Sequence, residues 1–162
     1  MPVCPYGEQI SLSWVPLIDN MIPSNAIHKG NEDIYIARMV HAGEHIPGKY
    51  SGRYRTAYCP YGGSEHEYGD CEILCDTTAR NSSSKLDWEW ETMGRVPLGA
   101  VVGGVAKDGE NLYIARSQIH GETVYGKVHP RHTNAYFPYG GKEHGIPDYE
   151  VLVKRVHMAS KI

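Results

Sequence analysis

The chain has 162 residues, and its hydrophobic content of 41% and charged content of 22% are ordinary for a soluble globular protein. A net charge of −3 with no basic runs argues against nucleic acid or an anionic membrane as the main partner. No apolar run approaches the roughly 18–20 residues of a membrane-spanning helix, so membrane insertion is not expected.

The first segment, residues 1–12, is expected to be an N-terminal extension. It opens with Met-Pro-Val-Cys-Pro-Tyr-Gly-Glu, which lacks the basic start and apolar core of a secretory signal. This predicts a cytoplasmic protein or one secreted by an unconventional route. A mature product of a longer precursor remains open.

Two copies of one repeat follow. Residues 57–66 read Ala-Tyr-Cys-Pro-Tyr-Gly-Gly-Ser-Glu-His, and residues 135–144 read Ala-Tyr-Phe-Pro-Tyr-Gly-Gly-Lys-Glu-His. The match extends without a gap from residues 33–76 onto 111–154, with nearly half of the positions identical. Positions that this alignment pairs are called equivalent below. We predict a first repeat over 13–76, a polar connector over 77–86, a second repeat over 87–154 and a tail over 155–162.

Short strands separated by turns dominate both repeats. In the second repeat, strands are expected at 112–116, in a segment ending near 126–128, at 134–138 and at 148–154, and the first repeat follows the same plan. Eighteen Gly and ten Pro fit this pattern of many turns. The prediction is an all-β fold in which two tandem repeats form a pseudo-twofold compact β-sandwich or prism, with strand exchange between the lobes left open.

The cysteines have neither metal-finger spacing nor a CxxC motif. Cys59, Cys71 and Cys75 fall opposite Phe137, Tyr149 and Val153, so they are predicted to be small buried thiols. A disulfide scaffold is the alternative, disfavoured because no signal for an oxidising compartment is seen.

Charged side chains recur at equivalent positions. Arg38 and Arg116 are predicted to form structural ion pairs with Glu72 and Glu150, with ligand contact as the alternative.

In the decamers, Glu65-His66 and Glu143-His144 are expected to fix the Gly-Gly turn by local hydrogen bonds, which makes the decamer scaffold rather than site. A metal or catalytic pair is the alternative. The cluster of His41, Glu44, His45 and His66 is not repeated as a set, so no metal site is expected.

The second repeat carries Gly-Gly-Val and Asp-Gly-Glu before Leu-Tyr-Ile-Ala-Arg, then Gly-Lys-Val-His-Pro, the decamer and Tyr-Glu-Val-Leu. These motifs resemble the DM9 repeat, and the resemblance covers about residues 13–154. DM9 repeats occur in tandem in invertebrate proteins and in the lectin-like part of some natterin-like toxins. The resemblance implies an all-β tandem DM9 fold. It also implies a mannose-binding lectin that acts in innate pattern recognition, like the DM9 proteins of bivalves.

The resemblance also implies a sugar site in each repeat. In lectin members, sugar hydroxyls are held by the lysine of the Pro-Gly-Lys turn and by an acidic residue in the loop before the Tyr-Ile-Ala-Arg strand. Carried over by motif, the first acidic position is best matched by Glu32, whereas the second holds Ala106. The implied carbohydrate-binding set is Glu32, Asp33, Lys49, Asp108 and Lys127. A solvated surface ion pair is the alternative for Glu32 and Lys49.

These observations favour a carbohydrate-binding lectin of mannose type, which recognises glycans multivalently without turnover. No cofactor is expected, and the chain is not expected to be an enzyme, since no nucleophile with a paired base stands out. A homodimer is the default expectation for a small soluble protein. The alternative function is a non-catalytic protein-interaction or signalling module that binds no sugar.

Overall fold

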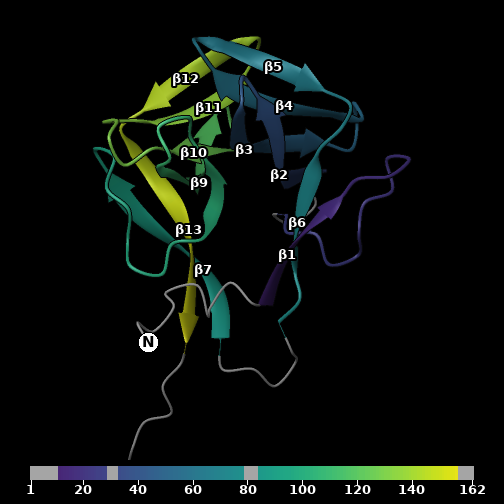
Figure 1. Ribbon diagram of the computed structural model, residues 1–162, viewed down its shortest axis with the longest axis horizontal. Helices are drawn as coiled ribbons and strands as arrows, with labels where there is room; N and C mark the ends of the chain where they lie inside the picture. The colour runs from purple at the N-terminus through teal and green to yellow at the C-terminus, as the bar shows by residue number, and fades with distance from the viewer. Residues whose placement is uncertain (1–10, 29–32, 79–83, 157–162) are drawn as a thin grey trace, which may run out of the picture.

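The structure is a computed structural model that describes residues 11–28, 33–78 and 84–156. Its regular elements form one 13-stranded antiparallel sheet, which confirms the all-β prediction (Figure 1). The first repeat contributes β1 (Leu12–Pro16), β2 (Ile34–His41), β3 (Glu44–Ser51), β4 (Thr56–Tyr61), β5 (Ser64–Tyr68) and β6 (Glu72–Asp76). In the described ranges, no helix is long and apolar enough to cross a membrane.

The second repeat follows the same plan with one added strand. It contributes β7 (Ser84–Thr92), β8 (Val102–Val105), β9 (Asn111–Ile119), β10 (Glu122–Val128), β11 (Ala135–Tyr139), β12 (Lys142–Ile146) and β13 (Asp148–Val156). The registers match as well: Trp14 stands opposite Leu74, and its equivalent Trp88 stands opposite Leu152. Duplication therefore extends from the sequence to the strand pairing.

The two lobes close into one ring of strands. The sheet runs β3-β4-β5-β12-β11-β10-β9, and β8 pairs with both β9 and β3, which joins the two ends of that run. Strand pairing in the described residues joins the lobes at two places, at Lys142 opposite Ser64 and at His45 opposite Val105. Figure 1 shows β5 and β12 side by side where the lobes join.

Side chains on alternating faces of the strands form three hydrophobic cores. Each lobe has a core of its own, and the remaining core lies between the two lobes. The shared cluster draws equivalent residues from both repeats, so the lobes are packed as one unit; it contains Ile36, Leu74, Val101, Ile114, Tyr125 and Leu152. All six are at most 1% exposed. Modules of this size bury little surface alone, and a shared core raises that fraction.

The predicted arginine ion pairs are confirmed. Arg38 Nε lies 2.9 Å from Glu72 Oε1, and Arg116 Nε lies 2.8 Å from Glu150 Oε2. Each guanidinium also stacks on a tryptophan, with Arg116 Cζ 4.2 Å from the ring centroid of Trp88. The pairs tie the central strands of each lobe to β6 or β13.

One charged contact joins two residues that occupy equivalent positions in the two repeats. Lys154 is fully buried, hydrogen-bonds to the Thr78 hydroxyl, and lies with its Nζ 3.9 Å from Asp76 Oδ1. In the alignment, Asp76 is the residue that corresponds to Lys154. The repeats therefore carry opposite charges at this pair of equivalent positions, which lie against each other.

The cysteines described by the structure are buried and unpaired, as predicted: Cys59, Cys71 and Cys75. Burial raises the pKa of the Cys59 and Cys71 thiols to about 12, so both stay protonated at neutral pH. Cys4 lies outside the described residues.

The strands β5 and β12 were not predicted. They follow directly on the Gly-Gly turns and carry polar residues, and those turns had been expected to end the strands before them. Backbone hydrogen bonds to β4 and β11 make these segments strands, although their side-chain pattern does not predict a strand.

A tight backbone contact generates a stability prediction. A Cβ at Gly126 would lie 2.1 Å from the Tyr136 carbonyl oxygen, so Gly126→Ala forces β10 away from β11. We expect the free energy of unfolding to fall by about 3 kcal/mol in urea denaturation. Gly69→Ala is the matched control, because its Cβ would meet no atom within 4 Å. Equal stability of the two variants would contradict the close strand approach.

Candidate functional site

The Gly-Gly turns of the two repeats are joined by reciprocal hydrogen bonds. The backbone N–H of Glu65 donates to the Gly141 carbonyl and that of Glu143 to the Gly63 carbonyl, each at 3.1 Å. The side chains complete the exchange, since Glu65 Oε1 accepts from the Gly141 N–H and Glu143 Oε1 from the Gly63 N–H, again at 3.1 Å. We call this set of four bonds the Gly-Gly clasp.

Glycine is required in the clasp for a conformational reason. Gly63 and Gly141 have φ values of 87° and 83°, a region that residues with a Cβ rarely adopt. His66 and His144 stabilise the same turns by hydrogen bonds from Nε2 to the carbonyls of Tyr61 and Tyr139, at 2.9 and 3.0 Å. The predicted local role of the two histidines is therefore confirmed.

The first pocket lies beside the clasp, around Lys49 of β3. It is a hollow of about 370 Å³ whose described walls come from both repeats: Ile34, Lys49, Ser51, Tyr54, Tyr58, Glu65, Glu67, Glu122, Tyr139 and Gly140. The Lys49 Nζ lies 3.6 Å from Glu65 Oε2 and above the rings of Tyr58 and Tyr139, 5.3 and 5.1 Å from their centroids. A tyrosine of the second repeat thus completes the site of the first.

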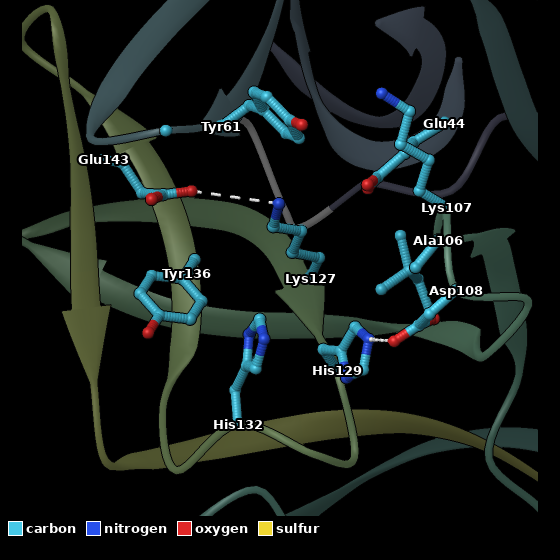
Figure 2. A pocket seen from close by; sticks show the side chains of 12 residues that line it. Glu44, Tyr61, Ala106, Lys107, Asp108, Lys127, His129, His132, Tyr136 and Glu143 are labelled. Atoms are coloured by element: carbon cyan, nitrogen blue, oxygen red, sulfur yellow. Dashed lines mark hydrogen bonds and ion pairs between the residues drawn. The ribbon is translucent and has the colours of Figure 1, made fainter. Parts of the chain in front are cut away.

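The second pocket is equivalent in construction and is centred on Lys127 of β10 (Figure 2). It is a hollow of about 380 Å³ with described walls from both repeats: Glu44, Tyr61, Gly62, Ala106, Lys107, Asp108, Leu112, Lys127, His129, His132, Tyr136 and Glu143. Lys127 Nζ lies 3.8 Å from Glu143 Oε2 and 5.3 Å from the ring centroid of Tyr61. Here a tyrosine of the first repeat completes the site of the second.

Burial governs the electrostatics of both lysines. The side chains of Lys49 and Lys127 are 11% and 9% exposed, and desolvation lowers the pKa of each ammonium group. The neighbouring Glu65 and Glu143 oppose this shift by favouring the charged form. The ion pairs, at 3.6 and 3.8 Å, are longer than a short N–H···O bond.

The structure brings some of the predicted residues together and separates others. Lys127 and Asp108 line the same hollow, but the Asp108 Oδ2 is 2.9 Å from His129 Nε2 rather than against the lysine. Asp33 lines a hollow that adjoins the Lys49 pocket through shared walls. Glu32 lies outside the described residues.

The decamer forms pocket walls as well as turns. Its glutamate pairs with the lysine of its own repeat, and its second tyrosine reaches the lysine of the other repeat because the ring closes. The residues that the sequence prediction missed are identical in both copies, and this identity was the signal that could have found them: Glu44, Tyr58, Tyr61 and Glu65, with Glu122, Tyr136, Tyr139 and Glu143.

The buried ion pair generates a prediction. Glu65→Gln keeps an acceptor for the Gly141 N–H but leaves Lys49 charged and unpaired, so the free energy of unfolding should fall on the order of 3 kcal/mol near neutral pH. The loss should shrink as pH rises through the lowered pKa of Lys49, because the neutral amine needs no counter-charge. Denaturation at several pH values measures both effects.

Two controls accompany this measurement. Glu67→Gln alters an exposed carboxylate of the same hollow and should change stability little. Adding Lys49→Met to Glu65→Gln should restore most of the loss, since no buried charge then lacks a partner. A loss that persists in the double variant would contradict the ion-pair explanation.

Comparisons with known proteins find relatives of similar sequence. Natterin-4 of Thalassophryne nattereri is 32% identical over 153 residues, which cover 91% of this chain and 35% of that protein. Natterin-3 of the same species is 33% identical over 112 residues, covering 65% of this chain and 27% of that protein. The chain thus spans about a third of the length of these curated relatives.

A solved structure shares the fold. The crystal structure of the nematode sperm cell motility protein MFP2B superposes with a TM-score of 0.59 at 21% sequence identity, covering 85% of this chain and 40% of that one. The family model described as the DM9 repeat matches residues 29–146, which include both pockets. The match covers well over half of the sequence, and the chain therefore belongs to the DM9-repeat family.

Proposed function

We propose that this protein is a lectin that binds neutral sugars of mannose type through its two lysine-centred pockets, without catalytic turnover. The observation that carries the proposal is the repeated convergence of one ammonium group, one carboxylate and tyrosine faces around an open hollow. Membership in the DM9 family supports a carbohydrate-binding, lectin-like role.

The pocket chemistry suits a vicinal diol. A carboxylate has about four lone-pair sites. Glu65 uses one of these for the Gly141 N–H and one oxygen faces Lys49, which leaves acceptor capacity for a sugar hydroxyl. The ammonium group donates to hydroxyl oxygens, and a tyrosine face covers the apolar C–H side of the ring. Mannose presents both features, a diol and a C–H patch.

Two pockets on one chain would allow the protein to bind a repetitive glycan at two points. A single shallow site of this kind binds with a Kd of roughly millimolar to micromolar, about 4–8 kcal/mol. Two linked sites raise avidity toward a repetitive glycan by about 10²–10⁴. A homodimer would double the sites again, and such multivalency is what recognition of microbial surface glycans in innate immunity needs.

A protein-binding role is the second candidate. Leu98 and Met93 are 97% and 56% exposed in the loop between β7 and β8, where a partner protein would cover them. This role predicts capture of a protein partner, lost on Leu98→Asp, together with no binding to any glycan.

The lectin proposal is tested by removing the ammonium groups. Lys49→Met and Lys127→Met should each lower the mannose stoichiometry in calorimetry from two to one, and the double variant should lose mannan binding at least tenfold. Methionine keeps the buried volume, and circular dichroism checks that each variant stays folded although Glu65 or Glu143 loses its ammonium partner. Lys85→Met, at an exposed position of β7, is the matched control and should bind as the unaltered chain does.

Two results would count against the proposal. Undiminished mannan binding by the double variant would show that the sites lie elsewhere. Failure of the unaltered chain to bind any neutral glycan on an array, with free mannose as competitor, would remove the lectin function.

A further inference from the structure

The two pockets are equivalent in backbone but differ in charge. Among the described walls of the first pocket, Lys49 faces Glu65, Glu67 and Glu122, so one lysine against three carboxylates leaves a formal charge of −2. No histidine is among these described walls. The first pocket therefore keeps its negative balance across the physiological pH range.

The second pocket has more basic groups. Its described walls carry two lysines, Lys107 and Lys127, against three carboxylates, a formal charge of −1 when its histidines are neutral; the carboxylates are Glu44, Asp108 and Glu143. Two histidines, His129 and His132, replace the equivalent Ser51 and Tyr54 of the first pocket. The repeats have diverged in the charged groups around an otherwise equivalent lysine.

Hydrogen bonds fix the role of His129. Its Nδ1 accepts from the Arg131 backbone N–H at 3.1 Å, so the ring proton is on Nε2, which donates to Asp108 Oδ2 at 2.9 Å. Asp108 also accepts from the Glu110 N–H, and Glu110 in turn pairs with Arg131 at 2.9 Å. Both nitrogens of this 5%-exposed imidazole are thus engaged, as is the Asp108 carboxylate.

His132 is the group left open to a ligand. It is exposed, its ring stacks on His129 at 4.3 Å with planes 13° apart, and its edge meets Tyr136. Within the described ranges neither of its ring nitrogens has a hydrogen-bond partner. Figure 2 shows its ring below Lys127 among the residues that line the hollow.

The surroundings of His132 disfavour its protonation while the pocket is empty. Burial, followed by the neighbouring His129 and Lys127, lowers the pKa of His132, and Asp108 and Glu143 oppose that effect. An anionic group placed between His132 and Lys127 favours the charged imidazolium and so opposes this lowering of the pKa. Binding of such a group is therefore coupled to uptake of a proton by His132.

We propose that the second pocket selects a carboxylate-bearing sugar, a hexuronic acid, whose carboxylate lies between Lys127 and His132. Glu143 is already held by Lys127 and the Gly63 N–H, so it does not compete for the ring nitrogen of His132. Protonation of His132 brings the described walls to formal neutrality, whereas the first pocket stays at −2 and repels the same ligand. This specificity rests on the proposed lectin function and adds a preference for acidic sugars at the second pocket.

The test compares glucuronate with glucose, which has the same ring but no charge. By titration calorimetry, glucuronate should bind one site per chain and tighten at least fivefold from pH 7.5 to pH 5.5, within the limit of about tenfold per pH unit for one linked proton. Titrations in buffers of different ionisation enthalpy should show proton uptake, and glucose affinity should not change with pH.

The chain offers a matched exchange of residues. His132→Tyr installs the residue found at the equivalent position of the first pocket, and it should abolish the pH-dependent gain for glucuronate. The reverse exchange, Tyr54→His, should not create acidic-sugar binding, because Glu65, Glu67 and Glu122 remain. Lys127→Met should remove glucuronate binding entirely.

The outcomes separate this inference from the lectin proposal. Mannose binding at two sites with pH-independent or absent glucuronate binding would overturn only the acidic-sugar assignment, as would a gain that survives His132→Tyr. Glucuronate binding without any neutral-sugar binding would overturn the mannose proposal and support this one. Absence of both would overturn both.

Discussion

The architecture depends on the exchange of four hydrogen bonds between two Gly-Gly turns. Glu65 and Glu143 each use a backbone N–H and a carboxylate oxygen on the turn of the other repeat, in addition to the bonds from His66 and His144 within each turn. Gly63 and Gly141 are exposed, so these bonds act by joining the two repeats at a defined register. The clasp therefore fixes β5 against β12, and this junction together with the β8–β3 pairing closes the ring.

Ring closure also makes the sites. Each lysine belongs to one repeat, while the tyrosine and the glycine turn on the far wall of its pocket belong to the other. The same glutamate that clasps the opposite turn supplies the counter-charge for its own lysine, which links folding to the charge state of the pocket. A single repeat contains every residue type that is needed, yet it builds only part of a pocket.

Local patterns predicted the local features well. Alternation and turn residues gave the strands around Arg38 and Arg116, and the matched strand positions predicted the ion pairs with Glu72 and Glu150. The lysines followed from the resemblance to the DM9 repeat. The polar strands β5 and β12 were missed because their partners, not their own side chains, determine them.

The composite walls could not be derived from periodicity, since contacts across the ring join residues that are distant in sequence. Identity of a residue in both copies was the one available signal for them. His129 and His132 lacked even that signal, because they differ from Ser51 and Tyr54.

The buried contact between Lys154 and Asp76 has a consequence for assembly. Because these residues occupy equivalent positions, pairing a first repeat with another first repeat would set two carboxylates against each other, and pairing two second repeats would bury two ammonium groups. Only the mixed pair neutralises the contact. The two halves, although copies, have become a complementary pair, so a first repeat fits against a second repeat and not against another copy of itself.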